Sequence, residues 1–140
     1  MRKKILLLLF SILSFGTNSF AQYHKDILGE NFVQQTIQMP DDYEGKVIIT
    51  IVRKEAALPT TKAILYVHGF NDYFFQKSLA EHFNDAGFNF YAVDLRKYGR
   101  SMLSNQYPFQ VHNLNEYFAD IDTTLQIIKQ EGNHEILLMG

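Results

Sequence analysis

The residues of this chain best suited to chemistry lie in a short loop that begins at His68. The loop follows the apolar run of residues 63–67 and reads His68-Gly69-Phe70-Asn71. A glycine directly after a buried strand lets the backbone turn sharply, which leaves the next amide free to point into a crevice. Backbone N–H groups aimed at a developing oxyanion are the electrostatic part of acyl-transfer catalysis. The loop therefore nominates the Phe70 N–H as an oxyanion donor, supported by His68, Gly69 and Asn71; the alternative is an ordinary turn at the end of a strand.

A second polar loop follows the apolar run of residues 88–93 and reads Asp94-Leu95-Arg96-Lys97-Tyr98-Gly99-Arg100-Ser101. Because buried charges tend to be paired, we expect Asp94 and Arg96 to be partners that hold the loop, in preference to Asp94 being a catalytic base. Ser101 lacks the strand-to-helix turn that exposes a nucleophilic serine, so Ser101 and Gly99 are also expected to have structural roles in the loop. Phosphate binding is not indicated, because the pattern Gly-x-x-x-x-Gly-Lys is absent.

Metal and paired-carboxylate chemistry find little support in the sequence. The five histidines are scattered, and no His-Glu-x-x-His motif or close His/Asp cluster occurs, so we expect no metal site and no cofactor. Asp120 and Asp122 are two positions apart on an expected helix, which places them about 200° apart around its axis. Both are interpreted as acids in the first half of a helix, where the helix dipole favours negative charge.

An α/β framework is needed to position these loops. Residues 47–52 are β-branched at every position, which predicts a strand, and we expect residues 46–54 to pair with residues 32–39 as an antiparallel hairpin across turn residues 40–45. The later apolar runs lack strict alternation, as expected of parallel strands covered on both faces. These runs are residues 63–67, 88–93 and 136–139.

Two amphipathic helices are predicted between the later strands. The first has an apolar stripe and ends at Gly87 as a C-cap; the stripe consists of Phe75, Leu79, Phe83 and Ala86. The second begins after Asn113, with Glu116 completing a capping box, and ends at Gly132; its stripe consists of Leu114, Phe118, Ile121, Leu125 and Ile128. The order β-β-β-α-β-α-β predicts an α/β fold, in which an antiparallel hairpin precedes a parallel sheet with helices on both faces.

The first 21 residues have the features of a cleavable signal peptide. Basic residues at positions 2–4 precede an apolar core of 11 residues, 5–15, and Ser19-Phe20-Ala21 places small residues at both positions that a signal peptidase reads. Spanning a bilayer takes about 20 residues, so a stable membrane span is not expected. We expect cleavage between Ala21 and Gln22, and therefore a periplasmic or secreted protein in which residues 22–140 belong to one domain.

The charge balance of the mature chain argues against nucleic acid as a partner. The leader holds three of the 13 basic residues and none of the 15 acidic residues, which leaves 10 basic against 15 acidic residues and a formal net charge of −5. No stripe of Lys and Arg is present to neutralise a phosphate backbone. The chain has no cysteine, so neither a disulfide framework nor a lipid anchor on an N-terminal cysteine is possible.

Taken together, the two loops resemble the serine aminopeptidase and monoglyceride-lipase-like branch of the α/β-hydrolase superfamily. The likeness rests on His68-Gly69-Phe70-Asn71-Asp72-Tyr73 and on residues 91–101, which correspond to a recurring Asp-x-Arg-x-x-Gly-x-Ser pattern. The segments 26–29 and 41–47 also resemble bacterial members, so the likeness covers nearly all of the mature chain. Asn71 departs from the lipase-type His-Gly-x-Gly loop, in which a second glycine occupies that position.

The resemblance implies an exported serine hydrolase that acts on esters, such as acylglycerols or lysophospholipids, through a Ser-His-Asp triad. By matching position, Gly140 would be the first glycine of the G-x-S-x-G nucleophile elbow and Phe70 one oxyanion donor. All three triad residues would then lie beyond Gly140, so residues 22–140 are the N-terminal part of an α/β-hydrolase domain and are expected to be inactive alone. Two alternatives remain: an α/β-hydrolase with an Asp nucleophile, of the dehalogenase or epoxide hydrolase type, and a non-catalytic binding protein on the hydrolase scaffold.

Overall fold

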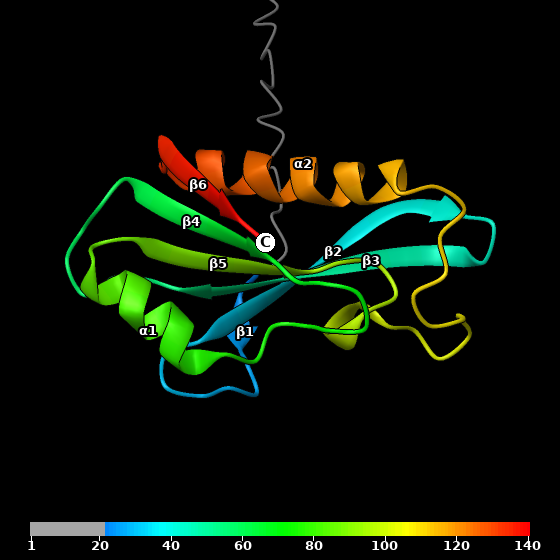
Figure 1. The fold of residues 1–140 in the computed structure, drawn as a ribbon, viewed down its shortest axis with the longest axis horizontal. Helices are drawn as coiled ribbons and strands as arrows, with labels where there is room; N and C mark the ends of the chain where they lie inside the picture. The colour runs from blue at the N-terminus through cyan, green and yellow to red at the C-terminus, as the bar shows by residue number, and fades with distance from the viewer. Residues whose placement is uncertain (1–21) are drawn as a thin grey trace, which may run out of the picture.

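A six-stranded mixed sheet with one helix on each face forms the framework of the protein. The computed structural model describes residues 22–140; the expected signal peptide, residues 1–21, lies outside the described residues. The strands are ordered β1-β2-β3-β5-β4-β6 across the sheet, and Figure 1 shows α1 and α2 on opposite sides of it. The elements are β1 (His24–Lys25), β2 (Val33–Asp42), β3 (Gly45–Lys54), β4 (Lys62–Val67), α1 (Lys77–Asp85), β5 (Asn89–Asp94), a 3-10 turn (Gly99–Ser101), α2 (Asn115–Gln130) and β6 (Glu135–Met139).

The predicted opening hairpin is confirmed, with a shorter turn than the sequence indicates. β2 and β3 pair antiparallel, but β2 continues through Pro40 to Asp42, which leaves only Tyr43 and Glu44 as the turn. The pairing register shifts between Met39 and Asp42, and such an irregularity accommodates a proline that cannot donate to the ladder. The short strand β1, which pairs with the start of β2, was not predicted.

The parallel part of the sheet follows the predicted order. β4 lies between β5 and β6 and is parallel to both, while β3 is antiparallel to β5. Successive residues of each strand alternate between the two faces. Ala63 and Leu65 of β4 therefore pack with α2 residues Ile127 and Ile128, whereas Ile64 packs on the α1 side. β4 and β5 are thus largely covered on both faces, as their apolar runs predicted. The prediction is wrong for β6 at the edge of the sheet, where Leu137 and Leu138 are 48% and 61% exposed.

Both helices end where the sequence predicted, but their apolar stripes are only partly correct. Gly87 and Gly132 follow the helices with φ of 83° and 89°, the left-handed conformation that terminates a helix. Phe75 is wrong as a stripe residue: it precedes α1 and is 52% exposed, while its neighbour Phe74 is buried. Leu114 and Phe118 are exposed as well, because they line an open cleft and do not face the sheet.

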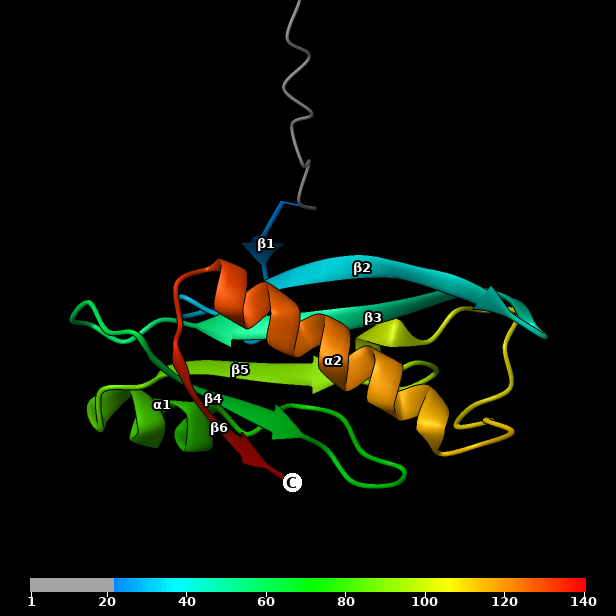
Figure 2. The same ribbon diagram turned by 90° about the horizontal axis from the view of Figure 1, so that it is seen from above.

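The contacts predicted at the start of the second helix are present, but the helix begins at Asn115 with Leu114 as its N-cap, one residue later than predicted. The Asn113 side chain accepts a hydrogen bond from Asn115 N–H at 2.9 Å, and the Glu116 carboxylate accepts one from Asn113 N–H at 3.1 Å. Figure 2 shows α2 crossing the sheet diagonally above the strands. Neither helix of residues 22–140 has the length and hydrophobicity that crossing a membrane requires.

Candidate active site

The loops that the sequence singled out converge at the carboxyl ends of the parallel strands. β4 ends at Val67, and Tyr66 pairs in register with Met139 of β6. Gly140 consequently lies beside the end of β4: a Cβ atom added to Gly140 would be 3.6 Å from the carbonyl oxygen of Val67. The chain therefore brings Gly140 next to the loop of His68 and Phe70, which is the edge of the sheet where ligands bind in α/β folds.

His68 fixes the first loop to the second. Its side chain is buried, and Nε2 accepts a hydrogen bond from the backbone N–H of Leu95 at 3.0 Å. An N–H can only donate, so Nε2 carries no proton and Nδ1 donates to the carbonyl oxygen of Gly69, 2.8 Å away. The Tyr98 ring packs against the imidazole at 4.7 Å between centroids. His68 therefore holds the Gly69-Phe70 turn against the loop that follows β5.

Phe70 is an exposed residue of this turn. Its residue surface is 81% exposed, and no hydrogen bond within residues 22–140 uses its backbone N–H. The next residue, Asn71, has φ of 58°, a left-handed conformation that asparagine adopts more readily than most residues. Asn71, which stands where lipase-type loops have a glycine, therefore still allows a tight turn.

An apolar cleft of about 470 Å³ opens beside Phe70. Its walls come from the His68 loop, from the segment that precedes α2 and from the first half of α2. The lining residues are Val67, His68, Gly69, Phe70, Leu95, Tyr98, Phe109, Val111, Leu114, Tyr117, Phe118 and Ile121. A larger cavity of about 680 Å³, which includes Tyr23, Arg53 and Glu131, lies at the opposite end of the strands, away from the chemistry-bearing loops.

Asp94 holds its loop with a different partner from the predicted one. Its carboxylate is fully buried and accepts hydrogen bonds from Phe74 N–H at 3.0 Å and from the Arg100 guanidinium at 2.9 Å. Arg100 also pairs with Asp26 at 2.7 Å. The expected pair of Asp94 with Arg96 is therefore wrong. β5 ends at Asp94, so Arg96 belongs to the loop beyond the strand, where the alternation of the strand no longer holds its side chain on the same face as that of Asp94.

Arg96 pairs instead with Asp120 of α2. The guanidinium and the carboxylate approach to 2.8 Å, and both side chains are buried. Asp120 does lie in the first half of α2, as interpreted, but its carboxylate is buried in this ion pair, while Asp122 is exposed. Spacing on the helix placed the two acids on different faces correctly, but it could not tell which face meets a buried arginine.

Comparison with known proteins agrees with this geometry. The family model described as "Serine aminopeptidase, S33" matches residues 59–140, more than half of the chain. The chain belongs to the serine aminopeptidase family. A comparison with curated proteins gave no significant sequence match.

Solved structures of esterases and lipases share the fold of this serine aminopeptidase-family chain. A thermostable carboxyl esterase from Bacillus coagulans superposes with a TM-score of 0.62 at 19% identity, over 76% of this chain and 36% of that one. A lipase from Sulfolobus solfataricus gives 0.53 at 16% identity, over 84% and 41%. A cold-adapted esterase from an Arctic intertidal metagenomic library gives 0.55 at 11% identity, over 84% and 52%. The chain thus spans between about a third and a half of the length of these proteins, with the N-terminal part of an α/β-hydrolase fold.

Ser101 is not accessible for chemistry in this serine aminopeptidase-family chain. Its residue surface is fully buried, and Oγ donates a hydrogen bond to the carbonyl oxygen of Asp94 at 2.6 Å. Gly99 lies nearby with φ of 42°, and a Cβ atom there would be 2.5 Å from Cβ of Tyr73. Both residues therefore shape the second loop. Within the described residues, no group of three or more His, Cys, Asp or Glu could hold a metal ion.

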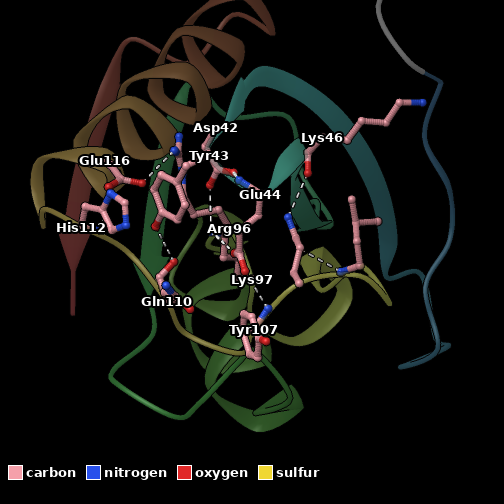
Figure 3. A network of polar contacts seen from close by, with 12 residues as sticks. Asp42, Tyr43, Glu44, Lys46, Arg96, Lys97, Tyr107, Gln110, His112 and Glu116 are labelled. Carbon is pink, nitrogen blue, oxygen red and sulfur yellow. Dashed lines mark hydrogen bonds and ion pairs between the residues drawn. The ribbon is translucent and has the colours of Figure 1, made fainter.

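Lys97 is the residue of this region that the sequence reasoning missed. Its side chain is completely buried, and Nζ lies 2.8 Å from Asp42 and 2.5 Å from Glu44 (Figure 3). Burial lowers the pKa of the Lys97 ammonium, but hydrogen bonds to the two carboxylates outweigh this and raise it to about 12. No local pattern pairs residue 97 with a hairpin tip more than fifty positions earlier, so only the folded chain reveals the contact.

Proposed function

We propose that the protein containing this chain is an exported serine hydrolase that cleaves carboxylic esters with apolar acyl groups. One observation carries the proposal: a Cβ atom added to Gly140 would lie 3.6 Å from the carbonyl oxygen of Val67, the last residue of β4 and three positions before Phe70. A serine two residues after Gly140, in a G-x-S-x-G elbow, would emerge at the loop that carries the Phe70 N–H. Nucleophile and oxyanion donor would then flank one carbonyl carbon.

The chemistry would follow the serine hydrolase scheme. The serine hydroxyl would attack the ester carbonyl, a histidine would take its proton and return it to the leaving alcohol, and an aspartate would orient that histidine. The Phe70 N–H, braced through His68, would donate to the developing oxyanion together with the N–H that follows the serine.

The cleft supports an ester substrate over a peptide one. An aminopeptidase must bind the α-ammonium group of its substrate, which calls for a carboxylate. No Asp, Glu, Lys or Arg lines the cleft in the described part of the chain, and burial raises the pKa of the Tyr117 hydroxyl, which keeps that side chain neutral. An aliphatic acyl chain matches such a lining.

Labelling of the full-length protein with a serine-directed fluorophosphonate tests this proposal. We expect one labelled serine, at the second position after Gly140, and loss of labelling on its replacement by alanine. Phe70→Pro, which deletes the N–H, should lower kcat by about a hundredfold or more, whereas Phe70→Ala keeps the N–H and most of the activity. An aspartate in place of that serine would favour a hydrolase of the dehalogenase type. A position that holds neither serine nor aspartate would favour a binding protein.

Export is the second part of the proposal and has its own test. Cell fractionation should find the protein outside the cytoplasm, and N-terminal sequencing of the mature form should begin at Gln22. A cytoplasmic protein that retains residues 1–21 would refute export without touching the hydrolase assignment.

A further inference from the structure

The tip of the β2–β3 hairpin packs against residues 105–112, the segment that supplies one wall of the cleft. Four hydrogen bonds join them. Gln106 Nε2 donates to the carbonyl oxygen of Lys46 at 2.9 Å, and the Tyr43 hydroxyl donates to the carbonyl oxygen of Gln110 at 3.0 Å. Glu44 accepts the other two, its carboxylate from Tyr107 N–H at 3.1 Å and its carbonyl oxygen from Asn105 Nδ2 at 3.4 Å. The Tyr43 ring also stacks on His112 at 3.5 Å between centroids. Figure 3 shows these contacts around the hairpin tip.

Lys97 lies at the centre of this contact. Its ammonium pairs with the carboxylates of Asp42 and Glu44, whose side chains are only 9% and 12% exposed, and it lies 4.4 Å from the centre of the Tyr43 ring. One buried cation therefore joins both carboxylates of the hairpin tip to the loop after β5. A buried ion pair of this kind can fix one arrangement of the elements that it joins.

The backbone of Lys97 continues the connection to the cleft. Its carbonyl oxygen accepts a hydrogen bond from Phe109 N–H at 3.3 Å, and both residues hold left-handed conformations, with φ of 64° and 62°. Conformations of this kind persist only where surrounding contacts enforce them. The Phe109 ring lies against Phe70, 5.6 Å between centroids, and against Tyr98 at 4.7 Å.

We propose that Lys97 is a positioning residue, which through Asp42 and Glu44 holds residues 105–112 in place and so keeps Phe109 as the wall of the acyl cleft beside Phe70. This inference rests on the proposed hydrolase function. In this proposal the Phe70 N–H meets the carbonyl oxygen of the ester, whereas the Phe109 side chain meets the carbons of the acyl chain. Lys97 therefore sets the preference for longer apolar acyl groups and leaves the chemical step unaffected.

The test compares Lys97→Met with the full-length wild-type protein and with Lys129→Met, which replaces an exposed lysine of α2. Hydrogen exchange followed by mass spectrometry should show about tenfold faster exchange in residues 105–112 for Lys97→Met only. With p-nitrophenyl esters, KM for octanoate should rise about tenfold while KM for acetate and both kcat values stay near wild type. Phe109→Ala should reproduce the KM effect, and adding it to Lys97→Met should change little more.

If Lys97→Met fails to fold because two carboxylates lose their partner, a second variant still tests the inference. The triple variant Lys97→Met, Asp42→Asn, Glu44→Gln leaves no unpaired charge and should show the same exchange and KM changes. Unchanged exchange in residues 105–112 overturns the inference, and so does faster exchange without an octanoate-selective rise in KM. If the wild-type protein hydrolyses no ester, the proposed function is refuted instead. The exchange measurement does not depend on ester hydrolysis, so the two failures are distinguishable.

Discussion

Arg96 and Asp120 form a buried bidentate ion pair that connects the loop after β5 to helix α2. Arg96 Nη2 lies 2.8 Å from Asp120 Oδ1, Nε lies 3.1 Å from Oδ2, and the Arg96 backbone N–H donates to Oδ2 at 3.1 Å. The loop that carries Lys97 and Tyr98 therefore cannot move without α2, whose first half forms a wall of the cleft. This ion pair therefore contributes both to the stability of the fold and to the shape of the cleft.

Asp120→Asn should destabilise the protein by about 3 kcal/mol, because it removes the nearest counter-charge of the buried Arg96 guanidinium and leaves the Glu116 carboxylate, 3.5 Å away. Asp122→Asn provides the matched control, since Asp122 is two residues away and exposed; its effect should stay within about 0.5 kcal/mol. Urea denaturation of both variants measures the difference. Equal losses for the two aspartates would contradict a buried pair.

Gly99→Ala should be more damaging than its left-handed conformation alone explains. A Cβ atom at position 99 would lie 2.5 Å from Cβ of Tyr73 and 2.7 Å from Oδ2 of Asp94. Gly87→Ala is the control, because Gly87 also has positive φ, 83°, but nothing within 4 Å of the added atom. We expect a loss of about 1 kcal/mol for Gly87→Ala and about 3 kcal/mol for Gly99→Ala. Thermal unfolding that gives equal losses would rule out a close contact at Gly99.

Ser101→Ala should separate a structural serine from a catalytic one. The hydroxyl donates to Asp94 at 2.6 Å inside the protein, and its removal leaves a buried carbonyl oxygen short of a donor, at a cost of about 1 kcal/mol. Fluorophosphonate labelling and ester turnover of the full-length protein should be retained. Complete loss of labelling, with the fold intact by circular dichroism, would make Ser101 the nucleophile and overturn its structural role.

Local patterns predicted the framework well because the strands and helices depend on neighbouring residues. The β-branched run 47–52 and the glycines 87 and 132 dictate their own conformations, and the structure has strands and helix ends there. The two-residue strand β1 carries no such signal, since it forms only by pairing with β2.

Partners of buried charges were predicted poorly, for a physical reason. The motif places Asp94 and Arg96 two positions apart, which suggested a pair, but β5 ends at Asp94, and Asp94 pairs with Arg100 whereas Arg96 pairs with Asp120. Such contacts depend on how elements pack, and packing joins residues far apart in sequence. The candidate oxyanion turn was predictable because it is local, whereas the Lys97 contact that supports its surroundings was not.

The contribution of Lys97 to stability should depend on pH in a defined direction. The hydrogen bond from Lys97 lowers the pKa of Glu44, and for Asp42 it outweighs burial, so that this pKa is lowered too. Lowered carboxyl pKa values stabilise the fold above about pH 4, where the unfolded carboxylates are ionised, and this stability is lost as pH falls through the folded values. Lys97→Met should therefore lower Tm by about 5 °C near neutral pH, and the difference from wild type should shrink below about pH 4. At the alkaline end the raised pKa of Lys97, about 12, keeps the pair intact until pH rises through that value. The control variant Lys129→Met should have the Tm of wild type at every pH. If the Tm difference between Lys97→Met and wild type stays constant down to a pH at which all carboxyls are protonated, Lys97 stabilises the fold through packing and not through charge.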